Sequence, residues 1–328
     1  MKKEMRRVSI SNQTNPPIKN NQSIPNQPAH NHHAGLIVTV IILTLAFMVC
    51  LILLLIKTPT PNANTALVHI NGVIYSGSGP GYNDGNTYSE DVSKVLDQIK
   101  KNKNIKAIIF EINSPGGGAV GSYDISQEIK KVRASGLLTV ALIREQGTSG
   151  AYWIASSCDY VISHPLAITG SIGVLASYLE FSGLLERFNI TYENINAGIY
   201  KDTMSPYREL TEEERVLLKS KINLIYEEFV RQVAENRNLS EDKVKELATG
   251  MFYIGSEAKE LGLIDETGNE DQAIHYVEAK IKEESNIKEY KISNSLYSLY
   301  GVQSKVFYWV GQGIGSALVK QNNWEIRA

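Results

Sequence analysis

Two short segments of the sequence carry a hydroxyl and an amine that could work together as a nucleophile and its base. Ser149 lies in a turn of small residues, Gly-Thr-Ser-Gly-Ala, and Lys201 ends the segment Gly-Ile-Tyr-Lys. A serine hydroxyl becomes a good nucleophile when a neighbouring base takes its proton. A free lysine amine is protonated at neutral pH, but burial disfavours the charged form of an amine. The pair therefore predicts acyl transfer, with Ser149 as nucleophile and a desolvated Lys201 as general base.

Glycine-bearing turns are placed to complete such a site. Asn-Ser-Pro-Gly-Gly-Gly (113–118) and the turn around Ser149 each follow an apolar segment, and Thr-Gly-Ser-Ile-Gly contains Ser171. The carboxyl ends of parallel strands meet at one edge of a sheet, so the turns can converge there. Glycine leaves backbone N–H groups uncovered, and Gly117 and Gly150 are predicted to bind the oxyanion of the tetrahedral intermediate. The hydroxyl of Ser171 is predicted to hold the lysine amine on the nucleophile.

Two neighbouring groups bear on this assignment. Asp202 follows Lys201 directly, and an ion pair between them would keep the amine protonated; we expect Asp202 to point away. His164 lies fifteen positions after Ser149, with Asp159 as the nearest acid that could orient it. A Ser-His peptidase that uses His164 is therefore an alternative to the lysine mechanism.

The elements around these turns alternate between strand and helix. Short β-branched runs predict strands at 66–74, 105–112 and 137–143, with helices from Ser89 and over 122–134 between them. This order indicates right-handed βαβ units and an α/β domain with a mainly parallel sheet. Later segments with helical spacing and N-terminal capping residues predict further helices, at 211–237, 240–248, 256–261 and 270–282.

An apolar segment precedes this domain. Residues 36–56 form a run of 21 without a charge, the length of a membrane-spanning helix. Lysine and arginine are concentrated before the run, which predicts a cytoplasmic N-terminus, contact with membrane lipid through residues 36–56 and an extracytoplasmic domain. The polar residues 1–35 are predicted to be a disordered cytoplasmic tail, and 57–65 a linker. Residues 66–286 then form the catalytic domain, and 287–328 a C-terminal tail.

Composition and motif content limit the partners and cofactors that we expect. The 328 residues carry a formal net charge of -2, which gives no reason to expect nucleic acid as a partner. The two cysteines lie far apart, and neither a metal-binding Cys or His spacing nor a nucleotide-binding glycine motif is found in the sequence. We therefore expect no cofactor and no metal.

Several motifs together resemble the signal peptide peptidase A family. They are Asn-Ser-Pro-Gly-Gly-Gly, Gly-Thr-Ser-Gly-Ala-Tyr, Thr-Gly-Ser-Ile-Gly-Val, Tyr-Lys-Asp-x-Met-Ser-Pro-x-Arg and Tyr-Ile-Gly-Ser-Glu-Ala-Lys-Glu-Leu-Gly-Leu-Ile-Asp, spread over most of 66–280. The resemblance implies a crotonase/Clp-like fold of repeated ββα units and a Ser–Lys dyad of Ser149 and Lys201, with Ser171 positioning the lysine. It also implies Gly117 and Gly150 as oxyanion donors.

The same resemblance implies a partner and a substrate. It implies a homo-oligomeric ring in which serine and lysine come from the same or adjacent subunits, and peptide substrates that are the hydrophobic remnants of cleaved signal peptides. Thr148 and Ala151 depart from the family's usual Ala and Gly around the serine, which narrows the turn slightly. The non-catalytic alternative is a ring-forming membrane scaffold, for which Ser149 and Lys201 would be dispensable.

Overall fold

The computed structural model describes residues 32–55, 62–80 and 84–291, and the chain divides into two compact units, Met1–Thr60 and Pro61–Ala328. Most of the expected N-terminal tail, of the linker and of the C-terminal tail therefore lies outside the described residues.

The first unit contains one described element, the helix α1 (His32–Leu55). The side chains that are described in it are exposed, and most of them are apolar. Across the described residues of the whole chain, no helix combines the length and the apolar character that crossing a membrane requires. The span predicted at 36–56 thus remains an expectation from the sequence.

Strands and helices alternate along the second unit. Its strands are β1 (Thr65–Tyr75), β2 (Thr87–Tyr88), β3 (Ala107–Gly117), β4 (Leu138–Thr148), β5 (Tyr160–Ser163), β6 (Ile168–Gly170), β7 (Phe252–Ile254), β8 (Glu266–Thr267) and β9 (Ile287–Glu289). Its helices are α2 (Ser89–Lys101), α3 (Ala119–Ala134), α4 (Gly150–Ser156), α5 (Ser182–Arg187), α6 (Glu212–Arg237), α7 (Glu241–Leu247), α8 (Gly255–Glu260) and α9 (Glu270–Ile281).

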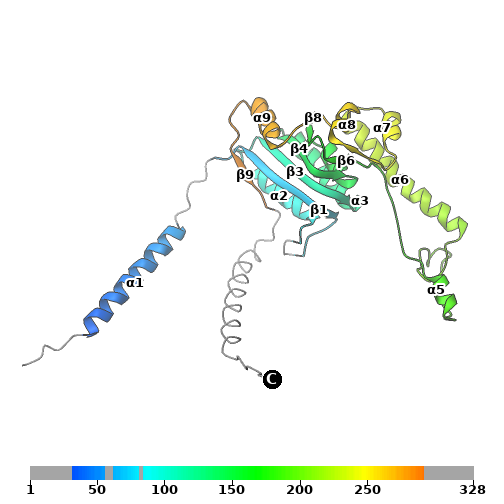
Figure 1. Ribbon diagram of the computed structural model, residues 1–328, viewed down its shortest axis with the longest axis horizontal. Helices are drawn as coiled ribbons and strands as arrows, with labels where there is room; N and C mark the ends of the chain where they lie inside the picture. Colours follow the sequence, from blue (N-terminus) through cyan, green and yellow to red (C-terminus); the bar gives the residue numbers. More distant parts are fainter. Residues whose placement is uncertain (1–31, 56–61, 81–83, 292–328) are drawn as a thin grey trace, which may run out of the picture. The chain divides into compact units, whose positions relative to one another are not determined.

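These strands form one sheet in the order β2-β1-β3-β4-β5-β8, with β9 paired to β1 and β6 paired to β4 and β7. All pairs are parallel except β6 with β7. The long strands β1, β3 and β4 lie side by side (Figure 1). The predicted α/β class with a mainly parallel sheet is therefore confirmed.

The ββα order implied by the resemblance is present in β1–β2–α2, whereas β3 and β4 each lead into a helix without a second strand. Both long strands continue through a shift in register instead, between Ile112 and Ser114 where β3 pairs with β4. A bulge of this kind bends a strand without ending it. The bent ends of β3 and β4 carry the two glycine turns.

Alternate residues of the central strands face two separate cores. In β3, Ile108, Phe110 and Ile112 pack with side chains of α2, α3, α4 and α6 in the larger core. Ala107 and Ile109 face the other way and pack with α9 in a smaller core. Because successive side chains of a strand point to opposite faces, both faces of the sheet carry apolar side chains, and helices cover both of them.

The predicted helices of the second unit are all present, within one to three residues of the expected ends. Thr211 caps α6 with a complete capping box, in which its hydroxyl accepts from the N–H of Glu214 and the Glu214 carboxylate accepts from the N–H of Thr211. The helix α2 begins at Ser89 as predicted, and its N-cap residue, Tyr88, forms no side-chain capping bond.

An ion pair fixes the far end of α6 to the sheet. The guanidinium of Arg237, which is 7% exposed, donates to both carboxylate oxygens of Asp265 at 2.9 and 2.8 Å. The same carboxylate accepts the backbone N–H of Val161 in β5 at 2.7 Å. Asp265 therefore joins α6 to β5 just before β8.

Replacing Asp265 by alanine is expected to lower the free energy of unfolding by about 3–5 kcal/mol, because it leaves the Arg237 charge buried without a partner. Urea denaturation followed by circular dichroism measures the change. Arg231→Ala on the exposed face of α6 is the matched control, and a loss within about 0.5 kcal/mol is expected there. Equal losses in both variants would contradict a structural role for the buried pair.

Candidate active site

Ser149 lies at the junction of β4 and α4, in a backbone conformation that is costly for a residue with a side chain. Its φ is 53° and its ψ is -124°. Its N–H donates to the carbonyl of Gly170 at 2.8 Å, and its carbonyl accepts from the N–H of Trp153 at 3.0 Å. Although Ser149 occupies the N-cap of α4, its hydroxyl does not cap the helix. Backbone bonds thus hold the strained turn while the hydroxyl remains available for chemistry.

Two glycine turns meet beside this serine. The N–H of Gly116 donates to the Ser114 hydroxyl at 3.0 Å, and that hydroxyl donates to the carbonyl of Gly72 at 2.6 Å. Gly116 has a φ of 94°, and a Cβ there would lie 2.7 Å from the backbone nitrogen of Gly150. Only a residue without a side chain allows the turns to approach this closely.

The same crowding surrounds Gly150. A Cβ on Gly150 would lie 2.1 Å from the hydroxyl oxygen of Ser122 and 3.4 Å from the backbone nitrogen of Gly117. The two predicted oxyanion glycines are therefore close neighbours across the junction of β3 and β4. Ser122 itself was not singled out from the sequence; its hydroxyl is buried and has no hydrogen-bond partner among the described residues.

The serine, both glycines and Ser171 line one cavity of about 710 Å³. Ser171 has a φ of 51°, and its hydroxyl donates to the carbonyl of Gly250 at 2.9 Å. The structure thus brings together four of the five residues that the sequence predicted for the site. Their roles as nucleophile, oxyanion donors and lysine-positioning group stay predictions.

The remainder of the cavity wall is largely apolar. Trp153 stacks on Phe229 with ring centroids 4.5 Å apart, and the hydroxyl of Tyr226 donates to the carbonyl of Ala248 at 3.0 Å. These four residues line the cavity together with Val174 and Leu175. Phe229 lies within the helix predicted at 211–237, but helical spacing alone does not separate a core position from a cavity wall.

Lys201 is not among the residues that line this cavity. It lies in an exposed turn ahead of α6, and its N–H donates to the carbonyl of Gly198 at 3.1 Å. The carboxylate of Asp202 forms an ion pair with Arg208 at 2.8 Å, and no ion pair between Asp202 and Lys201 is found among the described residues. Within the described residues of a single chain, the predicted base is therefore separate from the predicted nucleophile.

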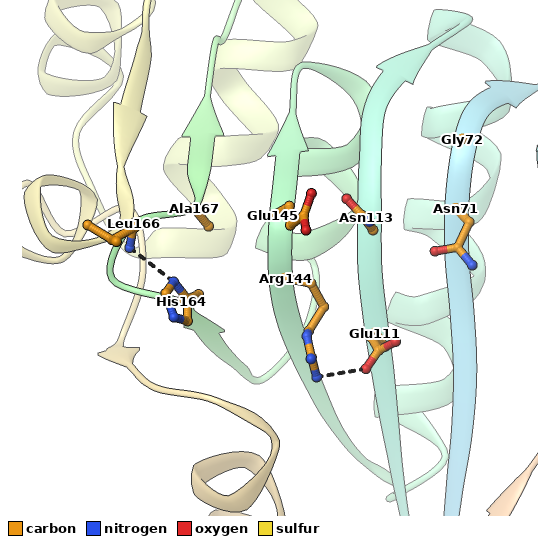
Figure 2. A pocket seen from close by; sticks show the side chains of 9 residues that line it. All are labelled: Asn71, Gly72, Glu111, Asn113, Arg144, Glu145, His164, Leu166 and Ala167. Carbon is orange, nitrogen blue, oxygen red and sulfur yellow. Dashed lines mark hydrogen bonds and ion pairs between the residues drawn. The ribbon is translucent and has the colours of Figure 1, made fainter.

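His164 belongs to a different cavity, of about 820 Å³, on the polar part of the sheet face beyond the smaller core. Figure 2 shows it beside Leu166, whose N–H donates to its Nδ1 at 3.2 Å, with Arg144 and Glu145 on the neighbouring strand. Ser149 does not line this cavity.

The acid proposed to orient His164 is also engaged elsewhere. The Asp159 carboxylate accepts from Arg133 at 2.7 Å and from the Thr139 hydroxyl at 2.8 Å. The described structure therefore does not assemble a Ser-His-Asp site from Ser149, His164 and Asp159. The described part of the chain likewise contains no cluster of three or more His, Cys, Asp or Glu side chains that could hold a metal ion.

Several known proteins are similar in sequence to this chain. The model of peptidase family S49 matches residues 131–284. A protein of Methanocaldococcus jannaschii, named as a candidate protease, is 34% identical over 226 residues, which are 68% of this chain and 72% of that protein. A candidate signal peptide peptidase SppA of Enterococcus faecium is 33% identical over 217 residues, 66% of this chain and 63% of that protein. A candidate protease of Synechocystis is 35% identical, over 66% of this chain and 74% of that protein.

A methyl group at position 150 tests the crowded junction. Gly150→Ala is expected to lower kcat for a fluorogenic peptide by about 10²–10³-fold, the usual cost of losing one oxyanion donor, because the methyl group collides with Ser122 and displaces the amide. Adding Ser122→Gly removes the collision and should recover at least about tenfold.

The control is Gly136→Asn in the exposed turn after α3, where an added Cβ meets no atom within 4 Å and asparagine tolerates the positive φ. Its kcat should equal that of the wild type. Unchanged turnover by Gly150→Ala would show that the amide at this position does not stabilise the transition state.

Proposed function

Because the chain belongs to peptidase family S49, whose members are serine-type peptidases, we propose that it is a membrane-anchored endopeptidase with a Ser149–Lys201 dyad. The Ser149 hydroxyl attacks the scissile carbonyl carbon while the neutral Lys201 amine takes its proton. The N–H groups of Gly117 and Gly150 receive the oxyanion, and Ser171 holds the amine in place. The lysine then protonates the leaving amine, and a water molecule hydrolyses the acyl-enzyme.

The observation that carries this proposal is the environment of Ser149. Its hydroxyl is not used as a helix cap, its backbone is held at positive φ, and the two glycine turns close against it. Strain of this kind persists only where surrounding structure enforces it, and it is concentrated at functional sites. A non-catalytic scaffold needs none of these features.

We propose that Lys201 reaches Ser149 across a subunit boundary. We call residues 174–207 the arm. No residue of the arm is buried, although it carries many large apolar side chains: Leu175, Leu179, Leu184, Phe188, Ile190, Ile195 and Ile199. Ile195 is 93% exposed and Ile199 is 86% exposed. Apolar surface of this extent favours association, and a second copy of the chain would cover it and carry the lysine to a neighbouring cavity. In a closed ring each copy covers the arm of its neighbour, so that every arm is covered.

The expected substrates are hydrophobic peptides, including the remnants of cleaved signal peptides. The exposed Leu175 and the half-buried Tyr226, backed by the buried stacked rings of Trp153 and Phe229, offer an apolar wall beside Ser149. Such a wall binds apolar side chains through the area that they remove from water. The similarity to a protein named signal peptide peptidase SppA supports the same substrate class.

We further propose that residues 36–56 anchor the chain in the cytoplasmic membrane, with the catalytic unit on the outer side. The support is the uncharged run of 21 residues and the lysines and arginines that precede it. An anchor would hold the apolar cavity close to peptides that remain in the bilayer after export. The crotonase/Clp-like assignment of the fold belongs to this proposal too, and it rests on the motifs.

Single substitutions test the dyad. Ser149→Ala and Lys201→Ala are each expected to lower kcat for a hydrophobic fluorogenic peptide by at least about 10³-fold, because each removes a group that acts only as part of the pair. His164→Ala is expected to keep wild-type turnover. Loss of turnover in His164→Ala with retention in Lys201→Ala would instead support the Ser-His mechanism.

Mixing the two inactive variants tests delivery across the boundary. In oligomers assembled from equal amounts of Ser149→Ala and Lys201→Ala chains, about a quarter of the sites should combine an intact serine with an intact lysine, so about a quarter of the wild-type activity is expected. Differently tagged chains that co-purify provide the control for mixed assembly. No recovery in verified mixed oligomers would place both groups in one chain.

A further inference from the structure

Arg208 forms a cluster of ion pairs beside Lys201. Its Nε donates to Oδ2 of Asp202 at 2.8 Å, and its Nη2 donates to Oδ1 of the same residue at 2.9 Å. On its other side, Nη1 and Nη2 donate to the two carboxylate oxygens of Glu214 at 2.9 and 2.6 Å. One guanidinium therefore holds two carboxylates, and both oxygens of Asp202 are occupied.

The cluster is attached to the start of α6. Glu214 is only 2% exposed, and it accepts the N–H of Thr211 at 2.9 Å and the hydroxyl of Thr203 at 2.8 Å. The hydroxyl of Tyr200 donates to the neighbouring Glu213. The turn that carries Lys201 is thus fixed on both sides to the first turn of a 26-residue helix.

The charges around the turn affect whether the Lys201 amine can act as a base. Asp202 follows Lys201 in sequence, and no ion pair of Lys201 is found among the described residues. Hydrogen bonds from Arg208, then from Asn194, hold the pKa of Asp202 well below its ordinary range, so this carboxylate stays ionised. An ionised carboxylate released from Arg208 would be free to pair with the adjacent amine, and it would favour the protonated amine.

We propose that Arg208 is a positioning residue for Lys201: by binding both oxygens of Asp202 against α6, it keeps that carboxylate from the amine and lets the amine act as a base. The inference rests on the proposed role of Lys201. The charged and titratable groups of the cluster around the lysine turn are Tyr200, Asp202, Arg208, Glu213 and Glu214. Arg208 is the only cation among these. Without it, Glu213 keeps its bond from Tyr200 and Glu214 keeps its bonds from Thr203 and Thr211, so Asp202 is the carboxylate that is released beside the amine.

A purely structural role for the same ion pairs makes a different prediction. Loss of Arg208 would then loosen the turn and lower activity by the same factor at every pH. An electrostatic role instead changes the pH at which the amine loses its proton. For a carboxylate and an ammonium about 6 Å apart, attraction between effective dielectric constants of 20 and 80 corresponds to a shift on the order of 0.5–2 pH units.

The experiment compares full-length chains in detergent micelles and measures Lys201 directly. The reaction of Lys201 with a small acylating reagent is followed against pH by peptide mass spectrometry, which reports the fraction of neutral amine without requiring activity. In Arg208→Gln the midpoint should rise by about 0.5–2 pH units. In the double variant Asp202→Asn/Arg208→Gln it should return to the wild-type value, because the competing carboxylate is gone.

Two further variants keep the test decisive. Asp202→Asn alone leaves Arg208 on Glu214 and should not raise the midpoint, even if Arg208→Gln disturbs the fold of the turn. Arg215→Gln removes an exposed ion pair with Glu212 in the same helix turn and should leave the midpoint unchanged. A midpoint that stays at the wild-type value in Arg208→Gln, or stays raised in the double variant, would overturn the proposal.

The pH dependence of kcat/KM separates this inference from the dyad itself. If Lys201 is the base, the ascending limb of the profile moves with the labelling midpoint in each variant. A labelling midpoint that moves while the limb stays fixed would support the control of Lys201 by Arg208 and reject Lys201 as the base. If the limb and the midpoint both stay fixed, the role of Arg208 is rejected, and this result does not contradict Lys201 as the base.

Discussion

The structure around the candidate site depends on one close approach between two stretches of backbone. The turn after β3 and the turn after β4 touch at Gly116 and Gly150, where a Cβ would come within 2.7 Å or less of another atom. The parallel pairing of β3 with β4 brings the turns to the same sheet edge, and the register of that pairing shifts between Ile112 and Ser114, just before the glycines. The strained backbone of Ser149 is held within this contact.

The two faces of the sheet differ in polarity at this edge. On the face of the larger core, apolar packing continues past the strand ends into α4 and α6, so the serine cavity acquires the aromatic wall of Trp153 and Phe229. On the opposite face the smaller core ends at Ile109 and Leu142, and the next residues in the same alternation are the ion-paired Glu111 and Arg144. His164 lies on that polar face (Figure 2). A histidine close to the serine in sequence is therefore on the wrong side of the sheet.

The segment that carries Lys201 is organised by charge rather than by burial. No residue of the arm is buried, yet Asp202, Arg208 and Glu214 join its last turns to a strongly capped helix. Such a segment combines a fixed lysine turn with apolar side chains that a single chain leaves uncovered. The ion pairs therefore define the shape of the lysine turn without burial of its apolar side chains.

The sequence by itself determined the features that are local. Short β-branched runs and capping residues predicted β1 and α6 closely, because the periods of strands and helices are set by neighbouring residues. The starts of β3 and β4 were predicted within two residues, but both strands run about five residues beyond their predicted ends, into the glycine turns. The glycines around Ser149 likewise predicted a turn. The parallel strands predicted that the turns meet at one edge of the sheet. The tertiary structure decided what depends on distant segments. It placed Tyr226 and Phe229 in a cavity wall, His164 on the opposite face and Lys201 outside the cavity, because packing between segments many residues apart leaves no periodic trace in the sequence.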